Sequence, residues 1–111
     1  MIRHLISALC LVAAANANAY SGNDLLNDLT STKRNGLTPG NALHDGVGMG
    51  YIMGASDMLI QSEAVCYPKN IKNGQISSAV QKYLEGNPEK RDAQAALLVY
   101  IALTVNFPCK K

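Results

Sequence analysis

The chain has 111 residues, of which 48% are hydrophobic and 16% are charged, and its formal net charge at pH 7 is +2. This length allows one hydrophobic core and excludes a second domain of ordinary size. The near balance of charges argues against nucleic acid as a partner, because phosphate binding needs a clustered excess of lysine and arginine.

The first 19 residues have the parts of a secretory signal peptide. Arg3 and His4 give a short basic start, residues 5–15 are mostly apolar, and the Ala-Asn-Ala sequence at 17–19 matches a cleavage site. The apolar run is shorter than the roughly 20 residues that a membrane span needs. We therefore expect cleavage after residue 19, export to the periplasm, and a mature helical domain of residues 20–111 that is not held in a membrane.

Apolar residues of the mature chain repeat at helical spacing and do not alternate as they do in a strand. This pattern predicts an all-α fold, a small bundle of four to five helices with one intrachain disulfide. A first short helix is expected over residues 24–33, with Asn23 as its N-cap. Asn35 and Gly36 are expected to end it.

Thr38 followed by Pro39 predicts an N-cap with proline at the first position of a long helix, which continues to about Ser62. We expect Met49 and Met53 to fill the core. Other apolar residues of this segment are spaced at threes and fours and are also expected to face the core: Leu43, Val47, Tyr51, Ile52, Ala55, Met58 and Leu59.

Four glycines interrupt this segment, at positions 46, 48, 50 and 54, and each costs up to about 1 kcal/mol relative to alanine inside a helix. Gly46, Gly50 and Gly54 are four residues apart and share one face. We expect this face to let another helix approach closely. The alternative is that one glycine marks a kink and the helix is two pieces.

A turn is expected at residues 66–70, because Pro68 disfavours helix in the residue before it. A third helix should begin at Asn73 or Gly74 and end at Gly86 in a left-handed cap. Its apolar residues match the spacing of one helical face without exception: Ile76, Ala79, Val80, Tyr83 and Leu84.

A fourth helix is expected to start at Asn87 and Pro88 and to run to about Asn106. It is apolar almost all round, so it should be central in the core or covered by a partner subunit. One face is expected to combine Ala93, Ala96, Leu97, Tyr100, Ile101 and Thr104.

Two of the three cysteines remain after cleavage, since Cys10 lies in the predicted signal peptide. Cys66 and Cys109 form the single possible pair, and an even count in a small exported chain usually means a disulfide. Closing a loop of about 44 residues would stabilise the fold by roughly 4 kcal/mol. The alternative is two free thiols.

The sequence offers no catalytic constellation. His44 is next to Asp45, and neighbours on a helix point about 100° apart, so they do not form a base and its orienting group. Histidines and cysteines lack metal-ligand spacing. The glycine run at 46–50 follows no strand and precedes no Lys-Ser or Lys-Thr pair, so it is not a phosphate loop. We predict no catalytic residue, no metal and no cofactor, and hence no enzyme.

An ordered set of short segments nevertheless forms a recognisable series. It comprises Gly50-Tyr51-Ile52-Met53-Gly54 with Asp57, Cys66-Tyr67-Pro68, Gln75 before Val80-Gln81-Lys82-Tyr83-Leu84, Asn87-Pro88-Glu89, Ala96-Leu97-Leu98-Val99, Ala102-Leu103 and Phe107-Pro108-Cys109. This series resembles the Rap and Tai families of type VI secretion immunity proteins. The resemblance implies a helical domain, commonly a homodimer, that binds and blocks a peptidoglycan amidase toxin. It also implies the Cys66–Cys109 bridge.

Such a protein would act by covering the cleft of the toxin. The expected contact residues are Tyr67, Lys69, Asn70 and Lys72, on the proline-stiffened turn beside the disulfide. An ordinary solvated turn is the alternative. Two other functions are alternatives. The first is a small periplasmic stress chaperone that unfolds in acid, and the presence of only eight acidic residues without a cluster disfavours it. The second is a subunit of an envelope complex that docks through the fourth helix.

Overall fold

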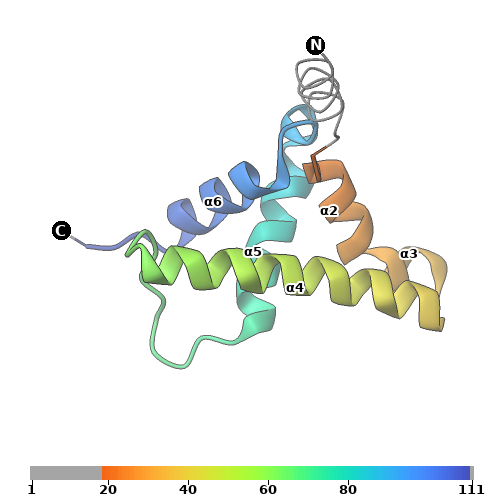
Figure 1. Cartoon of the computed structure of the whole chain (residues 1–111), viewed down its shortest axis with the longest axis horizontal. Coiled ribbons are helices and arrows are strands. Elements are labelled where there is room, and N and C mark those ends of the chain that lie inside the picture. The colour runs from red at the N-terminus through yellow and green to blue at the C-terminus, as the bar shows by residue number, and fades with distance from the viewer. Residues whose placement is uncertain (1–18, 111) are drawn as a thin grey trace, which may run out of the picture.

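A computed structural model describes residues 19–110, and the predicted signal peptide therefore lies outside the described residues except for its last one. In this described part of the chain, five α-helices and one 3-10 helix follow one another (Figure 1): α2 (Gly22–Leu29), α3 (Ser31–Asn35), α4 (Pro39–Gln61), α5 (Asn73–Gly86), η1 (Pro88–Lys90) and α6 (Ala95–Asn106). Within residues 19–110 no strand occurs, and one isolated bridge joins Ser21 and Gln94. The all-α prediction is confirmed.

The first predicted helix is two helices, and its expected N-cap is wrong. Ser21 caps α2: its hydroxyl accepts a hydrogen bond from Asp24 N at 3.1 Å, and its N–H donates to the Asp24 carboxylate at 3.0 Å. This reciprocal pair outcompetes Asn23 as the cap. Thr30 separates α2 from α3 with non-helical backbone angles. The expected stop is confirmed, since Gly36 follows α3 with φ 91°.

Helix α4 is continuous over 23 residues, so no glycine breaks it. Its predicted start is confirmed, because the Thr38 hydroxyl accepts a hydrogen bond from Asn41 N at 3.1 Å. Its buried face is the line of Gly48, Ile52 and Ser56, which faces the other helices. In Figure 1 this helix crosses the whole domain in front of α5.

The core assignment for α4 is partly wrong. Leu43 is 69% exposed, Met58 is 70% exposed and Val47 is also exposed, because α2, α3, α5 and α6 pack on the opposite side of this helix. Met49 and Met53 are half-buried, and Met53 packs against the core. Tyr51, Ala55 and Leu59 contact the core as predicted, and Ile52 is fully buried.

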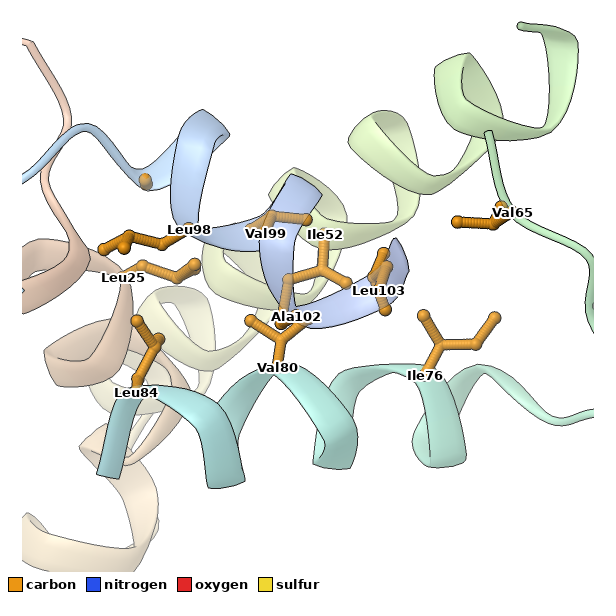
Figure 2. Packing of buried hydrophobic residues seen from close by; sticks show 11 residues of the cluster. Leu25, Ile52, Val65, Ile76, Val80, Leu84, Leu98, Val99, Ala102 and Leu103 are labelled. Carbon is orange, nitrogen blue, oxygen red and sulfur yellow. The ribbon is translucent and has the colours of Figure 1, made fainter. Parts of the chain in front are cut away.

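Helix α5 confirms its prediction almost entirely. Ile76, Val80 and Leu84 are buried in the core, and Figure 2 shows them pointing from one side of the helix toward α6 and α4. The expected left-handed cap at Gly86 is not formed. Asn87 takes over this role, since its side-chain amide donates to the Tyr83 carbonyl oxygen at 2.8 Å.

Helix α6 begins later than predicted, at Ala95 instead of Pro88. Backbone groups of the amino-terminal segment form hydrogen bonds with the residues just before α6 and with its first residue. Gly22 N donates to Ala93 O at 3.0 Å, Asn23 N donates to Arg91 O at 2.9 Å, and Ala95 N donates to Tyr20 O at 2.8 Å. In a continuous helix Ala95 N would donate to Arg91 O, but here Ala95 N bonds Tyr20 O and Arg91 O accepts from Asn23 N instead. The sequence from 88 to 94 therefore forms only the short η1 and a turn.

The expected face of α6 with Leu97 and Tyr100 is not the side that packs in the core. The structure buries Ala95, Leu98, Val99, Ala102 and Leu103, whereas Leu97 and Tyr100 are about half exposed. The core lies between α5, α6 and the middle of α4, with Leu25 of α2 closing one end (Figure 2). None of the helices within residues 19–110 is both long and apolar enough to cross a membrane.

Candidate functional site

The connection between α4 and α5, residues 62–72, is the long loop that leaves the helices in Figure 1. Its first half is fixed to the body of the domain. Val65 is buried in the core, and Cys66 N donates a hydrogen bond to Phe107 O at 3.0 Å. The Cys66–Cys109 disulfide, predicted from the sequence, is present with its Cα atoms 4.8 Å apart. The loop therefore leaves a rigid base that joins the end of α4 to the tail after α6.

Tyr67 extends this rigid base by one residue. Its hydroxyl lies 2.6 Å from the Ser56 hydroxyl of α4, and its ring meets the Phe107 ring edge to face at a centroid distance of 5.0 Å. Ser56 is only 2% exposed, so this contact also satisfies a buried polar group. Both ends of the Tyr67 side chain are thus occupied within the domain, and the residue is half-buried.

The tip of the loop projects from this base as a tight turn. Ile71 N donates to the Pro68 carbonyl oxygen at 3.3 Å, and Asn70 has φ 70°, a left-handed conformation that asparagine tolerates better than most residues. Lys69, Asn70 and Lys72 are exposed. The second half of the tip returns to α5, where the Gln75 side chain accepts a hydrogen bond from Lys72 N at 2.9 Å.

The four residues expected to contact a partner therefore lie in one loop, but they differ in their surroundings. Lys69, Asn70 and Lys72 present polar groups to solvent. Tyr67 contacts Ser56 and Phe107, and it supports the loop from beneath. Sequence reasoning missed Ser56 and Phe107 as parts of this site. The Phe-Pro-Cys ending was the available signal for Phe107, because the disulfide fixes its neighbour beside the loop.

The close approach expected at the glycine face of α4 occurs elsewhere within the chain. A Cβ atom placed on Gly46, Gly50 or Gly54 would have no neighbour within 4 Å. A Cβ on Gly48 would lie 3.1 Å from both the backbone nitrogen and the Cδ2 atom of Leu29. Residues four apart share a face as predicted, but α2 packs against the other side of α4, where Gly48 lies.

A second polar cluster lies where α2 meets α4. His44 Nδ1 lies 2.9 Å from Asp28 Oδ1, and the other oxygen of Asp28 accepts a hydrogen bond from the Tyr20 hydroxyl. Burial, followed by the hydrogen bond to Asp28, raises the pKa of Tyr20 far above its ordinary value. The Tyr20 ring also packs against Tyr51, with centroids 4.8 Å apart. No local pattern indicates the His44–Asp28 pair, because its members are 16 positions apart in the chain.

This cluster ties the amino-terminal segment to α4 and contains no serine or cysteine nucleophile aligned with His44. Ser31, the nearby hydroxyl, donates its hydrogen bond to Asn41 at 3.2 Å. Across residues 19–110 no three His, Cys, Asp or Glu side chains gather closely enough to hold a metal ion. The arrangement is therefore suited to holding α2 on α4, and the exposed loop is the better candidate for a functional surface.

A shallow groove adjoins the loop where α5 passes the end of α6. Its volume is about 430 Å³, and Lys72 and Lys82 are among the residues that line it. The rigid base of the loop, its exposed polar tip and the basic groove therefore lie next to one another. Together they form one continuous region at the end of the domain that carries the disulfide. Such a region can bind another protein without rearrangement, because most of its backbone is already fixed.

Comparison with protein families identifies a family to which the chain is similar. The sequence model of a family described as Rap1a immunity proteins matches residues 21–109, nearly the whole of the part that the structure describes. The matched region includes all five helices, the loop and both cysteines of the disulfide. No curated protein matches the chain.

Proposed function

Because this chain belongs to the Rap1a immunity protein family, we propose that it neutralises a peptidoglycan amidase toxin delivered by type VI secretion, and that it does so in the periplasm. An immunity protein acts by binding its cognate toxin and has no catalytic activity of its own. The family match is the observation that carries the proposal. The resemblance of the segments between residues 50 and 109 to amidase immunity proteins supports the choice of toxin.

Inhibition by occlusion fits the loop at residues 62–72. The core contact of Val65, the disulfide at Cys66 and the Tyr67–Ser56 hydrogen bond hold the base of the loop. Lys69 and Asn70 then project from a base that does not have to become ordered on binding. A preorganised protrusion loses little conformational entropy when it enters a cleft. Inserted into the active-site cleft of an amidase, it would exclude the peptide substrate from the catalytic nucleophile.

Export rests on two features of the chain. Residues 1–19 have the sequence of a cleavable signal peptide, and the remaining two cysteines are joined in a disulfide. Disulfides persist in oxidising compartments such as the bacterial periplasm, where peptidoglycan is also found. We propose that cleavage after Ala19 releases a domain that begins at Tyr20.

A homodimer is part of the same proposal. Apolar side chains on the outward faces of α4 and α6 are exposed, among them Leu43, Met58, Leu97 and Tyr100. We propose that these side chains are covered in the dimer, since large exposed apolar patches are typical of surfaces that associate. Sedimentation of the mature protein at several concentrations tests this element separately, and a monomer at all concentrations would contradict it.

Co-expression in the periplasm tests the function. Candidate amidases that lyse the host should be tolerated when this protein is exported with them, and they should lyse cells that express a version without residues 1–19. The variant Lys69→Glu/Asn70→Gly should lose protection while its circular dichroism spectrum and urea unfolding remain close to those of the wild type, because glycine tolerates the left-handed backbone of residue 70. Lys90→Glu is the matched control, since Lys90 is an exposed lysine in η1, outside the loop. Equal lysis with and without the exported protein, for every amidase, would refute the proposed toxin class.

A further inference from the structure

The groove between α5 and the end of α6 carries a chemical preference that the proposed function does not specify. Five polar side chains line it, together with Gly74 and Ala79: Lys72, Gln75, Ser78, Lys82 and Asn106. No aspartate or glutamate is among these residues. Lys72 is the N-cap residue of α5 and Lys82 lies ten positions later in the helix, about 15 Å along the helix axis, so the two lysines bracket the groove from both ends.

The start of α5 adds to the positive potential of this groove. The first turn of the helix, at Asn73 and Gly74, contains no acidic residue to offset the partial positive charge of the helix N-terminus. Gln75 turns its side-chain oxygen toward Lys72 N at 2.9 Å. Gln75 also lines the groove, and its side-chain amide carries two N–H donors.

The end of α6 makes an opposing contribution, because helix C-termini carry a partial negative charge. Asn106 reduces this contribution, since its side-chain amide donates to the Ala102 carbonyl oxygen at 2.7 Å. The two positive charges of the lysines and the partial positive charge at the start of α5 then outweigh the partial negative charge at the end of α6. The groove is complementary to carboxylates and repels lysine and arginine side chains.

We propose that this groove binds an acidic segment of the protein partner, with carboxylate side chains placed near Lys72 and Lys82. The inference rests on the proposed function only in taking the partner to be a protein toxin. Lys72 belongs both to the groove and to the exposed tip of the loop, so one partner would contact both. In this arrangement the loop fills the cleft of the toxin, and the groove selects toxins that carry acidic residues beside it.

A hexaglutamate peptide is the probe for the groove, and nuclear magnetic resonance of the mature, oxidised protein is the measurement. We expect amide shifts confined to residues 72–82 and Asn106, with binding that weakens as salt is added. The double variant Lys72→Gln/Lys82→Gln should weaken binding at least about fivefold. The control Lys33→Gln/Lys90→Gln removes two other exposed lysines and should leave binding unchanged.

Two results would overturn the inference: the absence of any shift at the groove, or equal weakening in the two double variants, which would indicate binding to lysines in general. The experiment does not need the toxin, so its outcome is separate from that of the co-expression test. Shifts at the groove in a protein that protects against no amidase would refute the proposed function and support the acidic-segment site. If an amidase is found that this protein neutralises, hexaglutamate should compete with that amidase for binding to the wild-type protein.

Discussion

Alanine substitutions at Gly48 and Gly50 test how α4 packs, because these two glycines lie on opposite sides of the same helix. A Cβ atom at Gly48 would approach the Leu29 backbone nitrogen and the Leu29 Cδ2 atom to 3.1 Å. At Gly50 the same atom would meet no heavy atom within 4 Å. The two variants add the same atoms to the same helix and differ only in what surrounds them.

The magnitude of each effect follows from two contributions. Alanine gains up to about 1 kcal/mol over glycine in a helix interior, and this gain applies at both positions. At Gly48 the added carbon overpacks the contact with α2, which typically costs about 1–3 kcal/mol. Part of Leu29 can rotate away, but its backbone nitrogen cannot. We expect Gly48→Ala to lower the free energy of unfolding by about 1 kcal/mol and Gly50→Ala to raise it by about 0.5–1 kcal/mol.

Urea unfolding of the mature, oxidised protein, followed by far-UV circular dichroism, measures both changes. The slope of the transition should be the same for wild type and variants, so that the midpoints report stability alone. The packing described for α4 is refuted if Gly48→Ala is as stable as Gly50→Ala. A midpoint of Gly48→Ala above that of wild type would refute it equally.

Three further predictions concern the loop, the disulfide and acid stability. The disulfide closes a loop with a sequence separation of 43, so its reduction should lower the free energy of unfolding by about 4 kcal/mol. Urea titrations with and without reductant measure this change, and an unchanged midpoint would show that the bridge is dispensable. Tyr67→Phe should cost about 1–2 kcal/mol because it leaves the buried Ser56 hydroxyl without its partner, whereas Tyr83→Phe, at another half-buried tyrosine, should cost less. The Thr32 side chain, and then the Thr32 N–H that donates to Asp45 at 3.0 Å, hold the pKa of Asp45 below its ordinary value. Asp45 therefore adds stability above about pH 4, and this stability is lost as the pH falls through the lowered pKa of Asp45. The variant Asp45→Asn should make the acid side of the profile of stability against pH flatter, and an unchanged profile would contradict this role.

The sequence predicted the fold well where one helical face is apolar and the other polar. In α5 the spacing of Ile76, Val80 and Leu84 identified the buried side directly. In α4 and α6 apolar residues occur on all sides, so periodicity could not decide which side is buried, and in α4 Leu43 and Met58 were placed in the core although they are exposed. Only the positions of the neighbouring helices settle that choice.

Contacts between distant parts of the sequence account for the other differences. The late start of α6 comes from hydrogen bonds between residues 20–23 and residues 91–95, which no local pattern announces. The disulfide could be predicted because only two cysteines remain after the expected cleavage. Tyr67 was correctly placed beside it, but the hydrogen bond to Ser56 and the ring contact with Phe107 depend on the packing of the whole domain.

Both extremities of the helical domain are anchored, although by different means. Three backbone groups between Tyr20 and Asn23 bond to the segment from Arg91 to Ala95 at the start of α6, and the other extremity is fixed covalently at Cys109. Fraying from the tails, the usual first step of local opening and of digestion by exopeptidases, is thereby suppressed. Proteolytic nicking should begin at internal exposed turns, at Gly36 and Leu37 or at Lys69 and Asn70, and a nick at the second turn would leave the two fragments joined through the bridge.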